Sequence, residues 1–287
     1  MNIIDVGSGP PLVLVPGIQG RWEWMRPAVE ALRARCRVLT FSLADEPSCG
    51  WTFDDAQGFD GYVEQIRQVL DARAIRTATI CGVSYGGLIA TRFAALHPDR
   101  VSALVLVSAL APGWSPDRRA RFFLRAPRLL FPLFLVGSLR MCPEIAAAAS
   151  GVGPGLRLGV RHAMNVLAHM LSPTRMARRV QMIQPVDLSE GLARVNVPTL
   201  LVTGEAALDR VVPVGLTASY RRIWPDALHV TLRRTGHLGL ITRPTEFAAI
   251  VTEFLRVRVA AGSAGRSAPK DDAHVAARGD DVGRKIG

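Results

Sequence analysis

The sequence predicts an α/β fold in which a mostly parallel sheet is flanked by helices. Two observations support this prediction. Short apolar runs alternate with amphipathic stretches over residues 1–111, and the same alternation returns over residues 191–259. Such alternation is typical of strand–helix–strand units. The segment between them, residues 112–190 and hereafter the insert, lacks the pattern. We therefore expect one core domain that is interrupted in sequence by a separate module.

The elements of the core follow from apolar spacing and from turn residues. Runs rich in Val, Ile and Leu predict strands, while apolar residues at helical spacing predict helices. The Gly-Ser-Gly-Pro turn at 7–10 separates the first two strands, and His97-Pro98 ends a helix. The predicted strands are 2–6, 12–15, 37–41, 77–81, 101–108, 199–203 and 228–232. The predicted helices are 25–35, 59–72, 85–96, 215–224 and 245–257.

The insert is dominated by Arg, Ala, Leu and Met in helical patterns that prolines interrupt, which predicts a helical cap. It carries 11 basic and 4 acidic residues, so most of the formal charge of +11 lies here. Its large apolar side chains are expected to form plain core, and an acyl pocket is the alternative. They are Trp114, Phe122, Phe123, Phe131, Phe134, Met164, Met170, Met176 and Met182.

Five arginines flank the apolar run of the insert: Arg118, Arg119, Arg121, Arg125 and Arg128. A solvated helix face is the favoured interpretation. Weak contact with an anionic membrane surface is the alternative. Nucleic-acid binding is not expected, because the excess charge lies in a predicted lid and few tyrosines are available to stack on bases.

Composition indicates the size of the core, the cellular location and the segments that lack regular structure. A chain of 287 residues with 49% hydrophobic residues can bury a large core. The longest uncharged apolar run, 129–139, is too short to span a bilayer, and the first ten residues do not resemble a signal peptide. The four cysteines are far apart, so reduced thiols and a cytoplasmic location are expected. Residues 260–287 lack apolar periodicity and predict a disordered tail. The sequence does not predict an oligomeric state.

The most informative motif is Gly82-x-Ser84-x-Gly86, between a predicted strand and a predicted helix. A sharp turn at this point exposes the serine hydroxyl, which is a weak nucleophile until a base takes its proton. The helix that begins at Tyr85 directs backbone N–H groups toward an oxyanion formed beside Ser84. The alternative interpretation is a glycine-rich turn without chemistry.

A nucleophilic serine requires a base and an acid that orients the base. His237 follows Gly236 after the predicted strand 228–232, and Asp209 follows the predicted strand 199–203. Because these strands end at the same sheet edge as the serine, the three side chains are expected to converge. Glu205 follows the same strand as Asp209 and remains an alternative acid. The other histidines have structural interpretations, namely His97, His162, His169, His229 and His274.

Ser84, Asp209 in Asp-x-x-Val-Pro, and His237 after Gly, in that order, resemble the α/β-hydrolase superfamily over about residues 1–259. The resemblance favours Asp209 as the acid, although two extra residues separate it from the preceding glycine. It also implies a cap in the insert, and oxyanion donors at the backbone N–H groups of Ile18 and Tyr85. The family's early His-Gly is Pro16-Gly17 here, and Asp45-Glu46 stands where an Asp-x-x-Gly-x-Gly loop is common.

The resemblance implies a serine hydrolase of esters, thioesters, lactones or amides that works through an acyl-serine intermediate. An acyltransferase with the same triad and a non-catalytic ligand-binding protein on the same fold remain alternatives. No cofactor or metal is expected, because the chain has no H-E-x-x-H, G-x-G-x-x-G or phosphate-loop lysine motif.

Overall fold

The computed structural model describes residues 1–149, 160, 164 and 171–259. Seven strands of this part form one sheet in the order β1-β3-β2-β4-β5-β6-β7. Only β1 runs antiparallel to its neighbour, β3. The strands are β1 (Ile4–Val6), β2 (Pro11–Val15), β3 (Arg37–Thr40), β4 (Ala78–Val83), β5 (Val101–Val107), β6 (Thr199–Thr203) and β7 (Leu228–Thr231). The predicted α/β class with a mostly parallel sheet is confirmed.

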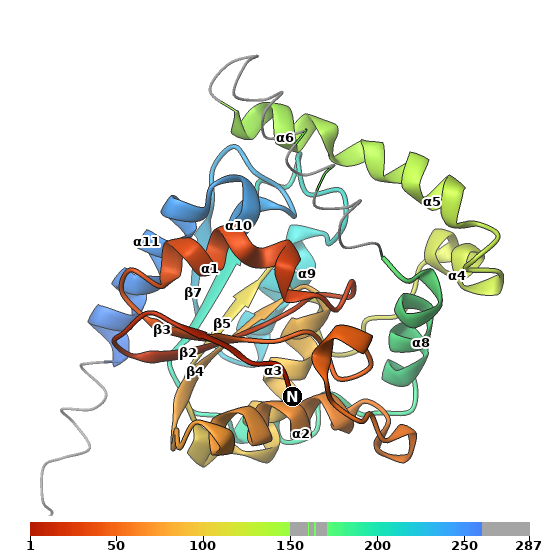
Figure 1. The fold of residues 1–287 in the computed structure, drawn as a ribbon. Coiled ribbons are helices and arrows are strands. Elements are labelled where there is room, and N and C mark those ends of the chain that lie inside the picture. The colour runs from red at the N-terminus through yellow and green to blue at the C-terminus, as the bar shows by residue number, and fades with distance from the viewer. Residues whose placement is uncertain (150–159, 161–163, 165–170, 260–287) are drawn as a thin grey trace, which may run out of the picture.

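Helices cover both faces of this sheet (Figure 1). One layer contains α1 (Arg26–Leu32), α10 (Gly239–Thr242) and α11 (Pro244–Phe254), which pack together. The other contains α2 (Asp60–Ala72), α3 (Tyr85–Leu96) and α9 (Val214–Ala218). Each layer encloses its own apolar cluster against the sheet.

The central strands are apolar at most positions, because both of their faces are covered. In β4, Ile80 packs in the cluster on the α3 side and Cys81 packs in the cluster on the α1 side. In β5, Leu104 and Val105 divide in the same way. Continuous apolar runs, rather than alternating ones, are therefore the sequence signature of this sheet.

Element boundaries differ from the predicted ones where short 3₁₀ or π turns replace regular helix. The predicted helix 25–35 is a 3₁₀ turn at Trp22–Met25 followed by α1, and the predicted helix 215–224 is α9 followed by a 3₁₀ turn at Ser219–Arg222. The final helix α11 continues into a π turn at Leu255–Val259. Strand β4 extends two residues beyond its predicted end, so it leads directly into Ser84.

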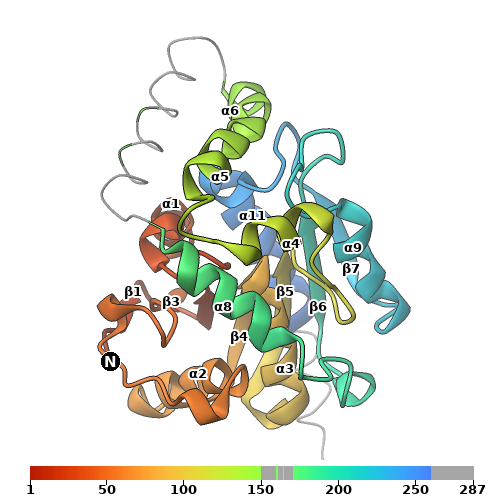
Figure 2. The same cartoon turned by 90° about the vertical axis from the view of Figure 1, so that its right-hand side faces the viewer.

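The described helices of the insert are α4 (Arg118–Arg125), α5 (Phe131–Ser138), α6 (Cys142–Ala148) and α8 (Pro173–Ile183), seen together in Figure 2. Neither α4 nor α5 buries a residue, so the expectation that their aromatic side chains form plain core is wrong. These rings instead pack against one another, with 5.7 Å between the centres of Phe123 and Phe134. Met170, His162, His169 and the tail 260–287 lie outside the described residues.

Among the described residues, one helical stretch, Phe131–Ala148, has the length and apolar composition needed to cross a membrane. It is weak support for a span, because Glu144 within it is buried against the core. The four cysteines are free thiols, as expected: Cys36, Cys49 and Cys81 are buried and Cys142 is exposed.

Candidate active site

Ser84 occupies a strained turn between β4 and α3. Its φ of 54° lies in the left-handed region that a residue with a side chain rarely adopts. The turn is fixed by hydrogen bonds from the Ser84 N–H to the carbonyl of Val107 (2.9 Å) and from the N–H of Leu110 to the carbonyl of Ser84 (3.1 Å). Such strain persists only where the surroundings hold it, and it is common at active sites.

The two glycines of the motif are required by close backbone approach. A Cβ atom on Gly82 would lie 2.4 Å from the carbonyl oxygen of Gly86. A Cβ atom on Gly86 would lie 2.4 Å from the carbonyl oxygen of Pro16. The turn therefore packs directly on the loop that follows β2, which contains Ile18.

We expect Gly86→Ala to lower the free energy of unfolding by about 1–3 kcal/mol, because the added methyl group would overlap the backbone of Val15 and Pro16. Urea unfolding followed by circular dichroism measures this change. Gly215→Ala in α9 is the control, because a Cβ atom there meets nothing within 4 Å. Equal stability of the two variants would contradict the close packing of the turn.

The predicted acid and base lie together. Nδ1 of His237 is 3.5 Å from Oδ2 of Asp209, and neither of these buried atoms has a hydrogen-bond partner in the part of the chain that the structure describes. Oδ1 of Asp209 accepts hydrogen bonds from the N–H groups of Val211 (3.0 Å) and Val212 (2.9 Å). Burial raises the pKa of Asp209, but His237 and these two N–H groups outweigh burial and hold that pKa below its usual value. The carboxylate is thus ionised and faces the imidazole.

The alternative acid has a different role in the loop. Oε1 of Glu205 accepts a hydrogen bond of 2.8 Å from the N–H of Arg234, and the Glu205 N–H donates to the carbonyl of Thr235. These contacts fold the turn that precedes His237. The geometry therefore favours Asp209 over Glu205 as the partner of the imidazole.

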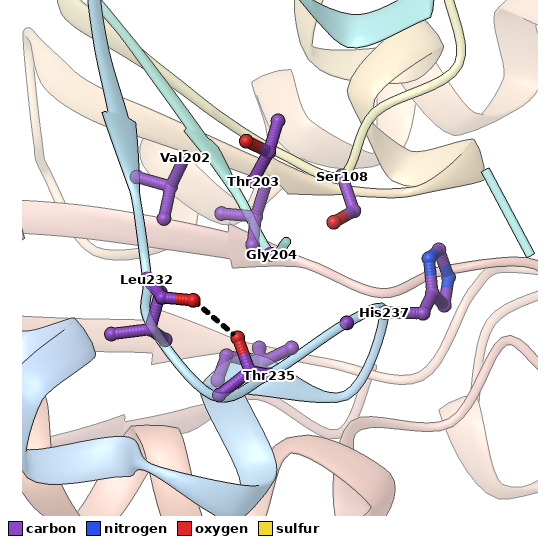
Figure 3. A pocket seen from close by; sticks show the side chains of 11 residues that line it. Ser108, Val202, Thr203, Gly204, Leu232, Thr235 and His237 are labelled. Atoms are coloured by element: carbon purple, nitrogen blue, oxygen red, sulfur yellow. Dashed lines mark hydrogen bonds between the residues drawn. The ribbon is translucent and has the colours of Figure 1, made fainter. Parts of the chain in front are cut away.

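The serine turn and the base follow β4 and β7, which β5 and β6 separate in the sheet, and both lie next to the carboxyl end of β5. A small cavity of about 10 Å³, enough for a single water molecule, is lined by Val107, Ser108, Gly204 and His237. Figure 3 shows Ser108 and His237 at one end of this cavity. Val107 is the residue whose carbonyl binds the Ser84 N–H. The side chain of His237 is 13% exposed and Ser84 is 7% exposed, so both are largely shielded from solvent.

The two predicted oxyanion donors flank the serine. Tyr85 is the first residue of α3 and directly follows Ser84, so its N–H group belongs to the amino end of the helix beside the serine. Ile18 lies in a turn closed by a hydrogen bond of 2.9 Å from the N–H of Gly20 to the carbonyl of Gly17. A Cβ atom on Gly17 would lie 3.5 Å from the Cβ of Ser84, so this turn is adjacent to the nucleophile.

The described histidines other than His237 have structural contacts. Nε2 of His229 lies 2.9 Å from the hydroxyl of Thr203, and His97 packs on Phe93 with ring centres 5.0 Å apart. Burial lowers the pKa of both imidazoles. Among the residues that the structure describes, no group of three or more His, Cys, Asp or Glu side chains is arranged to hold a metal ion.

The sequence did not identify two buried charged residues of the insert that contact the loops of the site. Arg179 of α8 is fully buried and donates to the carbonyl of Ile18. Glu144 of α6 is 1% exposed, and its Oε1 accepts hydrogen bonds from the N–H groups of Gly236 (2.7 Å) and Leu238 (2.6 Å), on either side of His237. No local motif marks either residue, because their partners lie far away in the sequence.

Burial raises the pKa of Glu144 to about 7, despite its two N–H donors and nearby His237. The folded state therefore binds a proton more tightly than the unfolded chain, and stability should fall as the pH rises from about 4.5 to about 7. We expect Glu144→Gln to be more stable than the wild type at pH 8, on the order of 2–3 kcal/mol, and similar to it at pH 4. Thermal unfolding at both pH values tests this. A constant difference between the two proteins across this range would contradict it.

Comparison with known proteins places the chain in a family. Residues 12–250 match the model of the alpha/beta hydrolase family. The chain is 30% identical over 254 residues to a pimeloyl-[acyl-carrier protein] methyl ester esterase of Vibrio atlanticus, covering 86% of this chain and 95% of the relative. It is 26% identical to the enzyme of the same name from Aliivibrio salmonicida, covering 87% of this chain and 94% of the relative.

Solved structures show the same fold. The enol-lactonase from Burkholderia xenovorans LB400 superposes with a TM-score of 0.71 at 21% identity, covering 89% of this chain and 96% of the lactonase. The superposition shows the shared fold, and the family match over residues 12–250 together with the 30% identical relative shows that the chain belongs to the alpha/beta hydrolase family.

Proposed function

We propose that this protein is a serine hydrolase that cleaves a carboxylic ester, or a related thioester, lactone or amide, through an acyl-serine intermediate. One observation carries the proposal: the strained turn places Ser84 at the same carboxyl edge of the sheet as the facing His237 and Asp209. The relatives that are named as methyl ester esterases support an ester as the substrate.

The proposed mechanism assigns one role to each side chain. His237 accepts the proton of the Ser84 hydroxyl as the serine oxygen attacks the carbonyl carbon. Asp209 faces Nδ1 of His237, which leaves the other ring nitrogen as the base and stabilises the imidazolium. The imidazolium then protonates the leaving alcohol. Water repeats the attack on the acyl-serine, with His237 again as the base.

The negatively charged oxygen of each tetrahedral intermediate requires hydrogen-bond donors close to Ser84. The N–H groups of Ile18 and Tyr85 are the proposed pair, because Ile18 lies in the turn beside Ser84 and Tyr85 begins α3. We propose that the insert, residues 112–190, is the cap over this site. Its contacts with the loops after β2 and β7 support that role.

Covalent labelling with a fluorophosphonate probe tests the nucleophile. We expect the wild type to be labelled at Ser84, with loss of labelling in Ser84→Ala and strong reduction in His237→Ala. Ser102→Ala is a matched control, because Ser102 lies near the opposite end of β5. Unchanged labelling of Ser84→Ala would remove the proposed function. Product analysis with a competing alcohol separates hydrolysis from acyl transfer, since a transferase would give mainly the new ester.

Weak contact of the cap with an anionic membrane surface is a further proposal. The apolar side chains of Leu129, Leu133, Val136 and Leu139 are 80%, 52%, 62% and 62% exposed, and arginines of α4 lie close by in sequence. We expect sedimentation with vesicles of phosphatidylglycerol but not of phosphatidylcholine, reduced in Leu133→Ser/Val136→Ser. Equal recovery with both vesicles would contradict this proposal.

The free thiols support a cytoplasmic location, which also remains a proposal.

A further inference from the structure

We propose that Arg179, a residue of the cap, holds the oxyanion-hole loop in its active conformation, so that docking of α8 and assembly of the oxyanion hole are one event. The inference rests on the proposed function, because it assigns a positioning role toward the N–H of Ile18. The described hydrogen bonds and ion pairs of this side chain go to Ile18, Asp45 and Glu46 rather than to Ser84 or His237.

The first observation is the complete burial of the guanidinium group. Arg179 is 0% exposed, although it lies on a helix of the insert. A buried cation is stable only where anions and acceptors surround it. Here Nη1 donates to the carbonyl of Ile18 at 2.7 Å, and Nη2 donates to Asp45 at 2.6 Å and to Glu46 at 2.7 Å. The side chain thereby joins three segments: the loop after β2, the loop after β3, and α8.

The second observation is that the loop is shaped around this side chain. A Cβ atom on Gly20 would lie 2.3 Å from Nη1 of Arg179, so a larger residue would displace the guanidinium. The carbonyl of Gly20 accepts a hydrogen bond of 2.7 Å from the N–H of Leu43. The turn from Gly17 to Gly20 is therefore held between Arg179 and the chain that leads to Asp45.

The third observation is that α8 contacts both proposed oxyanion donors. The side chain of Arg179 binds Ile18, and its backbone carbonyl accepts a hydrogen bond of 3.2 Å from the hydroxyl of Tyr85. A donor pair stabilises an oxyanion only if both N–H groups are fixed before the reaction. One residue of the cap thus fixes the residues that supply both donors.

This arrangement also explains how the oxyanion-hole loop is held although Pro16 stands in place of a histidine, and why Asp45-Glu46 follows β3. Pro16 has no polar side chain with which to anchor the turn that follows it. Asp45 and Glu46 are 3% and 1% exposed in their side chains, both accept hydrogen bonds from Arg179, and Glu46 also accepts one from Arg175. Arg179, Asp45 and Glu46 form one buried charged cluster. Through this cluster the cap holds the loop that contains Ile18, in place of a polar side chain within the loop itself.

The test compares Arg179→Met with Arg175→Met. Arg175 lies one turn earlier on α8, and its described hydrogen bonds go to Ser172 and, from Nε at 3.0 Å, to Glu46 rather than to the oxyanion-hole loop. For each variant we would measure kcat and KM with a p-nitrophenyl ester, and the inhibition constant of a trifluoromethyl ketone, whose adduct with serine carries an oxyanion. Because a single lost oxyanion donor lowers kcat by about 10²- to 10³-fold, displacement of the loop in Arg179→Met is expected to lower kcat by about 10- to 100-fold.

A positioning role predicts that inhibitor affinity falls by about the same factor as kcat while KM changes little. Arg175→Met should keep wild-type kcat and inhibitor affinity. Arg179→Lys, which retains a cation and N–H donors on a single nitrogen, should recover part of the loss. A folded Arg179→Met with wild-type kcat and inhibitor affinity would overturn the proposal, as would equal losses in Arg175→Met.

Removal of the guanidinium alone leaves two buried carboxylates without a cation, so Arg179→Met can fail to fold. The triple variant Arg179→Met/Asp45→Asn/Glu46→Gln removes the three charges together and is measured in the same way. Different results would contradict the proposed function and the proposed role of Arg179. If the wild type itself is not labelled at Ser84, the proposed function fails. If the wild type is labelled and the folded Arg179 variants match it in kcat and inhibitor affinity, only the role of Arg179 fails.

Discussion

Replacing Ser84 with alanine is expected to lower kcat/KM for an activated ester by about 10⁴- to 10⁶-fold, the range found when the nucleophile of a triad is removed. The large effect follows from the absence of any other hydroxyl on the strained turn between β4 and α3 that could form the acyl intermediate. Alanine has the same backbone preferences as most residues with a side chain, so the fold should persist. Steady-state hydrolysis and the thermal unfolding midpoint measure the two properties.

Ser102→Ala is the matched control for this measurement. Its hydroxyl lies 3.4 Å from that of Thr79, near the amino end of β5, whereas Ser84 follows the carboxyl end of β4. Activity of Ser102→Ala should equal that of the wild type. If Ser84→Ala retains more than a few per cent of the activity while folded, a different residue is the nucleophile.

Asp209→Asn is expected to lower kcat by about 10⁴-fold, because an amide cannot stabilise the imidazolium and favours the wrong tautomer of His237. The fold should be retained, since the remaining oxygen of asparagine can still accept the hydrogen bonds from Val211 and Val212. Activity measured across a pH range distinguishes impaired proton transfer by His237 from unfolding of the variant. Binding of substrate, reported by KM, should change little.

Glu205→Gln distinguishes the two candidate acids. Glu205 accepts a hydrogen bond from the N–H of Arg234, which glutamine can also accept through its carbonyl oxygen. We therefore expect kcat close to the wild-type value. A large loss in Glu205→Gln with an active Asp209→Asn would transfer the role of the acid to Glu205.

The core could be predicted from the sequence because its pattern is local. Helix α3 and strand β6 begin and end at their predicted residues, since apolar runs and the glycine-rich turn define them without reference to distant residues. The boundaries of α1 and α9 could not be predicted, because 3₁₀ turns continue the same apolar spacing. The exposure of Phe122 also could not be predicted, because a helical spacing of aromatic residues does not reveal whether a partner surface exists.

The candidate site also has features that the sequence could predict and features that required the coordinates. Ser84, Asp209 and His237 could be proposed from the sequence because each follows a strand of one parallel sheet, and parallel strands bring their carboxyl ends to one edge. The 3.5 Å separation of His237 and Asp209 and the contact of Glu205 with Arg234 required coordinates. The sequence left these two acids open because both follow the same strand.

The amino-acid sequence by itself determined the fold class, the turn that carries Ser84 and the order of the three proposed catalytic residues. These properties depend on hydrophobic periodicity and on glycine at positions that admit no side chain, which are local. Only the tertiary structure decided that Arg179 is buried beside Ile18 and Glu144 beside His237. Charged residues on a helix are normally solvated, and their burial depends on partners more than 90 residues away that chain folding alone brings into contact.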